Sequence, residues 1–278
     1  MHNPALVALG LDWRYLACDV HPERLGEAIA GAQAMKFIGL NLTVPHKLLA
    51  VDLVDELDVS AKTWGAVNTV RFEARDLSGA WQPLAKLNPE EVEEMRSVGF
   101  NTDADAITRS LREDLGLELS GASVLLLGAG GAGRTAALKL AAEGVGSLWL
   151  QNRTASKAEE VAAEIRKRFP RVQVAVGYPA GAVDLLLNAT SLGLKASDPS
   201  PLEEAKFALR QARHVYDMIY RPAETPLLRA AKAAGCQTAN GLGMLLYQGA
   251  QALEIWTGKF APVEVMRAAL VKNVYGNA

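Results

Sequence analysis

The stretch SVLLLGAGGAGRTAALKL, residues 123–140, decides the fold class of this 278-residue chain. It begins with a continuous apolar run, which is typical of a strand buried on both faces of a parallel sheet. Glycines follow in the spacing G-x-G-x-x-G, at Gly128, Gly130 and Gly133, and a helical segment comes after them. A strand, a glycine-rich turn and a helix in this order predict a nucleotide-binding βαβ unit.

Strand-like and helical segments alternate on both sides of this stretch. On the carboxyl side we expect strands at SLWLQ, VQVAV, VDLLLNA, HVYDMIY and CQTAN. On the amino side we expect a strand at residues 37–44 and helices at residues 46–57 and 88–98. This alternation predicts an α/β protein with a mostly parallel, doubly wound, Rossmann-type sheet. We expect the helical tail to pack on the first domain, so that residues 1–103 plus 244–278 form one domain and residues 104–243 the other.

The composition argues against several classes of protein. A formal net charge of −2 and a charged fraction of 22% do not favour a nucleic-acid or membrane surface. Neither a transmembrane stretch nor the pattern of a signal peptide is present in the sequence. The cysteines, Cys18 and Cys236, lack the spacing of a metal site. We therefore expect a cytoplasmic monomer or homodimer that acts on a small molecule and uses no metal, nucleic acid or membrane.

The glycine-rich turn is suited to a phosphate group. Residues without large side chains let the backbone approach a pyrophosphate closely. The N-terminus of the following helix adds unpaired N–H groups and a partial positive charge. We therefore expect the phosphates to be bound by Gly128, Ala129, Gly130, Gly131 and Ala132.

The end of the next strand, SLWLQNRTASK at residues 147–157, indicates which nucleotide is bound. An NAD site usually has an Asp or Glu here, which accepts a hydrogen bond from the ribose 2′-hydroxyl. This chain instead has Asn152, Arg153, Thr154 and Lys157. Cations and a hydroxyl favour the 2′-phosphate of NADP. The alternative is a solvated helix start that Thr154 or Ser156 caps.

The stretch NLTVPHK, residues 41–47, suggests where a substrate binds. Proline cannot continue a β-ladder, so Lys47 follows the carboxyl end of a strand. Open α/β sheets bind ligands at that edge. Lys47 is therefore a candidate substrate-binding residue, and the alternative is a solvated turn lysine.

Eight blocks of the sequence, in order, resemble the family of shikimate dehydrogenases and their quinate-specific relatives. The blocks are NLTVPHK, GAVNT, GFNTD, GAGGAGR, NRTASK, NATSLG, YDMIYRPAETPLL and GLGMLLYQGAQALEIWTG. The resemblance implies an N-terminal α/β substrate domain and an NADP-binding domain. It implies an enzyme that interconverts 3-dehydroshikimate and shikimate with NADP. Two other activities stay open: a quinate or aminoshikimate-type dehydrogenase, and a weakly active nucleotide-binding homologue.

The resemblance also implies roles for individual residues. Lys47 would be the catalytic lysine and Asp103 its partner. The substrate would be contacted by Thr43, Asn68, Tyr220 and Gln248, and the nicotinamide bordered by Met218 and Gly241. Converging amide, hydroxyl and carboxylate groups suit a polyol, because each buried polar group left unpaired costs about 1–3 kcal/mol.

The sequence departs from the family pattern in several places. Family members usually begin with a short strand and a segment with two serines that hold the substrate carboxylate. We expect that strand and both serines to be missing here, and shikimate to bind weakly as a result. Residues 70–98 are longer and more acidic than in the family, which predicts a solvated excursion or a partner contact. Asp105 stands near a position where the family commonly has glycine.

Overall fold

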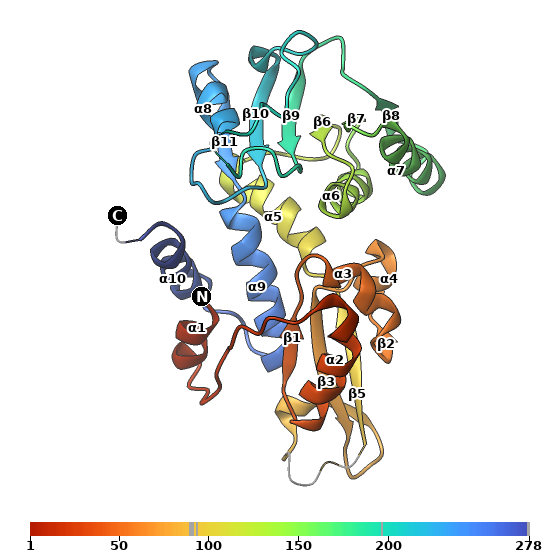
Figure 1. The fold of residues 1–278 in the computed structure, drawn as a ribbon, viewed down its shortest axis with the longest axis vertical. Coiled ribbons are helices and arrows are strands. Elements are labelled where there is room, and N and C mark those ends of the chain that lie inside the picture. Colours follow the sequence, from red (N-terminus) through yellow and green to blue (C-terminus); the bar gives the residue numbers. More distant parts are fainter. Residues whose placement is uncertain (89–91, 93, 196, 277–278) are drawn as a thin grey trace. The chain divides into compact units, whose positions relative to one another are not determined.

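The computed structural model describes residues 1–88, 92, 94–195 and 197–276 (Figure 1). The chain is α/β and divides into two units, so the expected fold class is confirmed. Unit 1 comprises Met1–Asp103 and Gln248–Val271, and unit 2 comprises Ala104–Tyr247 and Lys272–Ala278. The assignment of a substrate domain and an NADP-binding domain to these units stays a prediction.

Unit 1 is built on a sheet of mainly antiparallel strands. Its strands lie in the order β1 (Gly39–Asn41), β3 (Thr69–Arg75), β5 (Met95–Phe100) and β2 (Glu56–Leu57), and β4 (Trp81–Pro83) also pairs with β3. Among the described residues of this sheet, β2 and β5 are the one pair that runs parallel. The helices of this part of the chain are α1 (His2–Ala8), α2 (Leu25–Ala34), α3 (His46–Leu49) and α4 (Val59–Trp64), with short 3₁₀ turns at Pro22–Arg24, Ala50–Asp52 and Leu84–Lys86.

Two expectations for unit 1 were wrong. Residues 46–57 do not form one helix, because α3 ends at Leu49 and β2 occupies Glu56–Leu57. Part of the stretch 88–98 is a strand rather than a surface helix, since Met95–Phe100 pairs with β3 over six residues. Residues 89–91 and 93 of that stretch lie outside the described residues. In both places the pairing with a distant strand outweighs the local preference for a helix.

Unit 2 contains a parallel sheet of six strands, as the sequence predicted. The order is β11 (Gln237–Asn240), β10 (Ala212–Asp217), β9 (Val183–Asn188), β6 (Ser123–Leu127), β7 (Ser147–Gln151) and β8 (Gln173–Val176). The expected strands after the glycine loop are thus confirmed. The helices are α5 (Asp103–Leu115), α6 (Gly131–Ala142), α7 (Ala155–Arg168), α8 (Pro226–Ala233), α9 (Leu242–Thr257) and α10 (Val263–Tyr275), with a 3₁₀ turn at Leu209–Gln211. The boundary between the units falls within α5, α9 and α10.

Each unit has its own apolar core. In unit 1, side chains from α2 and β3 pack together, including Ile29, Val70 and Phe72. In unit 2, the buried set includes Leu125 and Leu186 of the parallel strands. Each large apolar side chain buried in this way contributes about 1.5–3 kcal/mol. The cores hold the strands rigidly, so the residues at the strand ends have fixed positions.

Trp256 of α9 fixes that helix on the sheet of unit 1. Its indole Nε1–H donates to the carbonyl oxygen of Val70 at 2.9 Å. The ring lies over Gly39, where an added Cβ would come within 2.2 Å of the indole nitrogen. Only glycine allows this approach, so Gly39 of β1 and Trp256 together set the position of α9 in unit 1.

The described residues of the stretch 70–98 include strand β4 and most of strands β3 and β5 of the unit 1 sheet. Trp81 of β4 lies between two guanidinium groups, with Arg75 and Arg96 each 4.5 Å from the ring centroid. Such cation–π contacts contribute about 0.5–1 kcal/mol at exposed sites.

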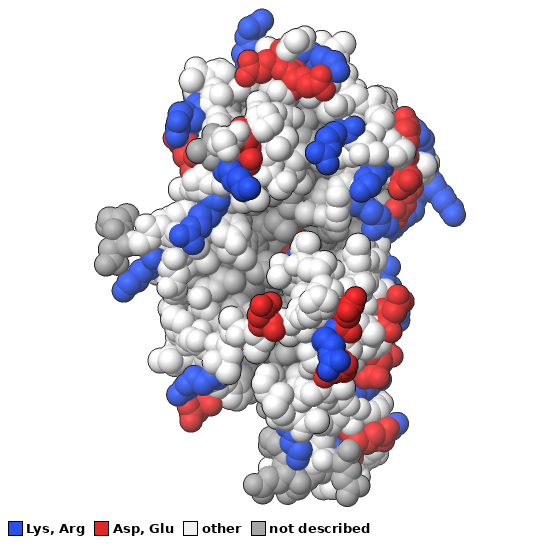
Figure 2. All heavy atoms as spheres, viewed as in Figure 1, with Lys and Arg blue, Asp and Glu red and all other residues white. Residues whose placement is uncertain are grey.

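The face shown in Figure 2 carries Lys and Arg residues interspersed with Asp and Glu. Within the described parts of the chain, no helix has the length and apolar character that a membrane span requires.

His2 is buried in unit 1. The ring is stacked on Tyr15 with 4.2 Å between the centroids, and its Nε2–H donates to the carbonyl oxygen of Gly249 at 3.1 Å. Burial lowers the pKa of His2 to about 4. Below pH 6.5 the unfolded chain therefore takes up a proton that the folded chain does not bind.

The free energy of unfolding should accordingly fall as the pH drops from about 6.5 to about 4, by about 3 kcal/mol in all. We expect His2→Gln, which retains a donor for Gly249, to lose less unfolding free energy than the wild type between pH 7.5 and pH 5. Urea unfolding at both pH values measures this difference. His21→Gln, at an exposed position, is the matched control, and an equal pH dependence in wild type and His2→Gln would contradict the prediction.

Candidate functional site

A buried polar cluster lies where β5 ends and α5 begins. Asn101, Thr102 and Asp103 follow β5 directly, and their exposed fractions are 1%, 0% and 9%. Asn68 stands beside them, just before β3, because its backbone N–H donates to the carbonyl oxygen of Phe100 at 3.0 Å. The antiparallel pairing of β3 and β5 thus brings together two polar segments that are far apart in the sequence.

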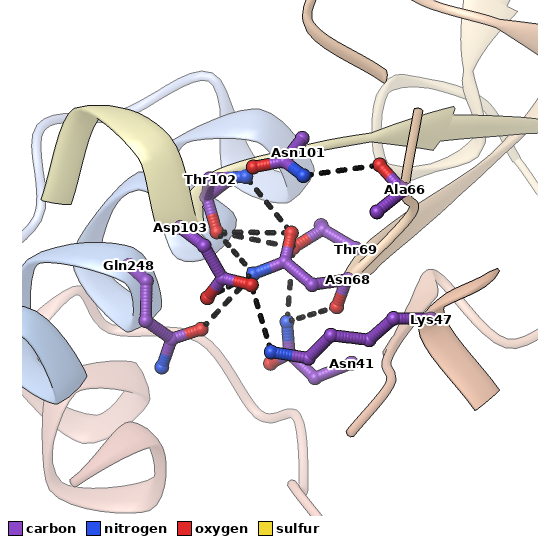
Figure 3. Close-up of polar contacts among 9 residues, drawn as sticks. All are labelled: Asn41, Lys47, Ala66, Asn68, Thr69, Asn101, Thr102, Asp103 and Gln248. Carbon is purple, nitrogen blue, oxygen red and sulfur yellow. Dashed lines mark hydrogen bonds and ion pairs between the residues drawn. The ribbon is translucent and has the colours of Figure 1, made fainter. Parts of the chain in front are cut away.

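Lys47 faces this cluster. Its ammonium lies 2.7 Å from Asp103 Oδ2, and the two side chains are 27% and 13% exposed. The backbone is held in place too, since the N–H of Val67 donates to the carbonyl oxygen of Lys47 at 2.9 Å. Lys47, in the short helix α3 that follows Pro45, is therefore directed at Asp103, as Figure 3 shows.

Asn68 binds the other oxygen of the same carboxylate. Its Nδ2 donates to Asp103 Oδ1 at 3.0 Å and lies 2.9 Å from Thr102 Oγ1 (Figure 3). Its Oδ1 accepts the backbone N–H of Thr102 at 2.8 Å, which determines which way the amide points. Gln248 of α9 reaches the edge of the group, with Oε1 at 3.5 Å from Asn68 Nδ2.

The structure brings together Lys47, Asp103, Asn68 and Gln248, all of which were expected to form a site. The turn residue Thr43 is exposed, and its carbonyl oxygen accepts the N–H of His46 at 2.8 Å. Among the described residues, Thr43 makes no side-chain hydrogen bond to the cluster. The cluster offers an ammonium, a carboxylate and amides to a ligand, so it can hold hydroxyl groups and exchange a proton with one of them.

The glycine-rich loop of unit 2 contains two kinds of glycine. Gly128 has a φ of +103°, and a Cβ on Gly133 would lie 2.0 Å from the carbonyl oxygen of Gly128. These two glycines allow the turn and the close packing of α6 against it. At Gly130 and Gly131, by contrast, a Cβ would meet nothing within 4 Å. The backbone there is open to a ligand.

The same loop ends at the N-terminus of α6. Gly130 is the N-cap, and no side chain makes a capping hydrogen bond there in the described part of the chain. The first N–H groups of the helix and its positive dipole end are thus available to an anion. Ala132 lies in the first turn of α6, and Ala129 in the loop before it donates its N–H to Asn152 Oδ1 at 3.0 Å.

Asn152 joins the two loops at this edge of the sheet. Besides accepting from Ala129, its amide donates to the carbonyl oxygen of Thr154 at 2.8 Å. Arg153, Thr154 and Lys157 are exposed at the start of α7. Thr154 is the N-cap residue of α7, and its side chain makes no capping hydrogen bond within the described residues.

The remaining expected residues follow the carboxyl ends of β10 and β11. Gly241 lets two backbone segments meet, because a Cβ there would lie 2.0 Å from the carbonyl oxygen of Met218. Tyr220 is 37% exposed, and its carbonyl oxygen accepts the Tyr275 hydroxyl at 2.8 Å. These residues belong to unit 2, as do the glycine loop and the start of α7.

Sequence reasoning missed Asp217, the last residue of β10. Its buried carboxylate accepts from Thr225 Oγ1 at 2.6 Å, Asn188 Nδ2 at 3.0 Å and the N–H of Ile219 at 3.1 Å. Burial raises the pKa of Asp217, although each of these donors opposes that effect. The contacts fix the segment that holds Met218 and Tyr220. The sequence feature that could have identified Asp217 is an acidic residue among apolar ones in HVYDMIY.

Models of one enzyme family match most of the chain. The model described as the shikimate dehydrogenase substrate binding domain matches residues 1–70. The shikimate / quinate 5-dehydrogenase model matches residues 110–213, and the shikimate 5′-dehydrogenase C-terminal domain matches residues 241–271. No set of three or more His, Cys, Asp or Glu side chains in the described residues could hold a metal ion.

Individual relatives agree with these matches. The NADP(+) shikimate dehydrogenase of Methanopyrus kandleri is 39% identical over 99% of this chain and 90% of its own length. A shikimate 5-dehydrogenase of Thermus thermophilus, solved with NADP(H) and shikimate, is 34% identical with a TM-score of 0.78, over 98% of this chain and 92% of that one. The 5-ketofructose reductase of Gluconobacter sp. strain CHM43 is 33% identical with a TM-score of 0.78, over 98% and 91%.

The two kinds of glycine should respond differently to alanine. Gly133→Ala forces the backbone apart at Gly128, so we expect it to lower the unfolding free energy by about 1–3 kcal/mol, as overpacking does. Gly131→Ala meets nothing within 4 Å and begins a helix, so it should change stability by less than about 0.5 kcal/mol. Urea unfolding without nucleotide compares the two variants. Similar losses in both would show that the loop does not need this close approach.

Proposed function

This chain belongs to the shikimate dehydrogenase family, and from that premise we propose that it catalyses the reversible, NADP-dependent reduction of 3-dehydroshikimate to shikimate. The observation that carries the proposal is the contact of 2.7 Å between Lys47 and Asp103. A lysine held by a carboxylate, beside buried amides, can bind a hydroxyl or carbonyl oxygen and move a proton to or from it.

The proposed substrate site is the polar cluster of unit 1. Asn68 and Gln248 would hold the hydroxyl groups of the ring, together with Thr43, and the expected contact of Tyr220 with the substrate stays a prediction. Asn68 is 1% exposed and its amide direction is fixed by Thr102, so it cannot adapt to a ligand with a different pattern of hydroxyls. A mismatched ligand would leave buried polar groups unpaired, at about 1–3 kcal/mol each.

In the direction of reduction, Lys47 acts as the proton donor. The hydride for the carbonyl carbon of the substrate would come from NADPH when it is bound. The Lys47 ammonium gives a proton to the carbonyl oxygen, which becomes the new hydroxyl. In the direction of oxidation the neutral amine takes that proton back. Asp103 orients the lysine, and Asn68 in turn orients Asp103 by holding its other oxygen at 3.0 Å.

The residues of unit 2 fit NADP. The open backbone at Gly130 and Gly131 and the uncapped start of α6 suit the pyrophosphate. Arg153, Thr154 and Lys157 would hold the 2′-phosphate, and Asn152 would keep the two loops together. Met218 and Gly241 would border the nicotinamide. As to localisation and oligomeric state, we expect a cytoplasmic enzyme that is a monomer or a homodimer.

Replacing Lys47 tests its proposed role. We expect Lys47→Met to lower the turnover number with shikimate by roughly 10²–10⁴-fold, because one positioned acid–base group is removed. NADPH affinity, measured by fluorescence titration, should stay within about twofold, since the nucleotide residues lie in the glycine loop and at the start of α7. Lys62→Met, at an exposed position of α4, is the matched control. Full turnover in Lys47→Met would reject the proton-transfer role.

Reversing the charge at Arg153 tests cofactor choice. Arg153→Glu should weaken NADP binding by roughly 10–100-fold, the effect of one hydrogen bond to a charged group. NAD binding, which involves no 2′-phosphate, should change much less. Titration of both nucleotides gives the ratio. Lys167→Glu makes the same charge change near the far end of α7, and an equal loss of NAD and NADP in Arg153→Glu would exclude a 2′-phosphate contact.

A further inference from the structure

Tyr15 is held in unit 1 by its backbone, its ring and its hydroxyl. Its backbone N–H donates to Asn3 Oδ1 at 2.7 Å, and Asn3 Nδ2 donates to its carbonyl oxygen at 3.0 Å. The ring is stacked on His2 with an interplanar angle of 12°. The hydroxyl donates to Asn41 Oδ1 at 3.0 Å. Burial also raises the pKa of Tyr15, which keeps the hydroxyl protonated.

Asn41, the last residue of β1, uses its whole amide inside the protein. While Oδ1 accepts from Tyr15, Nδ2 donates to Thr69 Oγ1 at 3.0 Å and to the carbonyl oxygen of Asn68 at 3.3 Å. Both N–H bonds therefore have acceptors on β3 or just before it (Figure 3). Asn41 is suited to orient its neighbours and has no remaining donor for a substrate.

These contacts form a chain of hydrogen bonds in which every donor points toward the catalytic pair. Since Thr69 Oγ1 accepts from Asn41, its own hydrogen can go to Asn68 Oδ1, which lies 3.4 Å away. Asn68 then presents Nδ2 to Asp103 Oδ1. Thr102 supports the same amide direction through its backbone N–H, so the chain adds to an existing constraint.

We propose that Tyr15 is a positioning residue of the substrate site, and that its hydroxyl acts through Asn41 and Thr69 to fix the amide of Asn68. The inference rests on the proposed function, because its test measures the kinetics of shikimate oxidation. In this role Tyr15 contacts neither the substrate nor the cofactor. Its loss should loosen the Asn68 amide. The Lys47 ammonium still holds Asp103 Oδ2 at 2.7 Å, so proton transfer and NADP binding should remain in place.

The central variant is Tyr15→Phe, which keeps the ring on His2 and removes only the hydroxyl. We expect the KM for shikimate to rise about three- to tenfold, the range of one neutral hydrogen bond. The turnover number and the KM for NADP should stay within about twofold. Tyr178→Phe is the matched control, because it removes a tyrosine hydroxyl that accepts the N–H of Glu203 in unit 2.

A double-mutant cycle tests the route of the effect. If Tyr15 acts through Asn41, then Tyr15→Phe should add nothing to the KM of Asn41→Ala. Thr69→Val, which keeps the shape of the side chain, gives a second background in which Tyr15→Phe should have no further effect. This second cycle decides the matter if Asn41→Ala does not fold.

Several results would overturn the inference. They are an unchanged KM in Tyr15→Phe, an equal change in Tyr178→Phe, and additive changes in a folded double mutant. If the wild-type protein does not oxidise shikimate at all, the proposed function fails by itself. The same cycle read in the urea-unfolding equilibrium then tests the coupling of Tyr15 to Asn41, and additivity there would reject it.

Discussion

The carboxylate of Asp103 is the interaction on which the candidate site of unit 1 depends. One of its oxygens binds the Lys47 ammonium at 2.7 Å, and the other binds the Asn68 amide at 3.0 Å. A carboxylate whose side chain is only 13% exposed needs such partners, because burying an unpaired charge is costly. The partners come from helix α3 and from the residue just before β3. One side chain thus joins three segments that have no local reason to meet.

The surrounding polar groups make this arrangement rigid. Asn68 and Thr102 are 1% and 0% exposed, and their side chains and backbone satisfy one another. A fully paired buried network specifies one arrangement, whereas a partly paired one would be among the costliest defects in a core. Rigid amides suit a ligand whose identity depends on where its hydroxyl groups lie. The same rigidity explains why a distant hydroxyl, on Tyr15, can influence the cluster through Asn41.

The nucleotide loop in unit 2 follows a different physical rule, based on space rather than on charge. Gly128 and Gly133 are required by the backbone itself, since a Cβ on Gly133 would lie 2.0 Å from a carbonyl oxygen. Gly130 and Gly131 instead leave an open surface beside the first N–H groups of α6. The motif therefore combines residues that shape the turn with residues that keep it accessible. Arg153 and Lys157 add positive charge at the start of the neighbouring helix α7.

By itself, the sequence determined the α/β class, the strand–turn–helix of residues 123–140 and the strands that follow it, because apolar runs and glycine turns act locally. It did not predict β2 or β5, whose residues look helical until β3 and β5 supply hydrogen-bonding partners. Lys47, Asn68 and Asp103 were singled out by resemblance to a family, since spacing alone left Lys47 as a possible turn residue. Only the tertiary structure decided that Lys47 faces Asp103, and that Tyr15 and Asn41 lie on the path to Asn68. The direction of a hydrogen bond between distant residues is set when strands pair and side chains are buried, and no local pattern in the sequence records it.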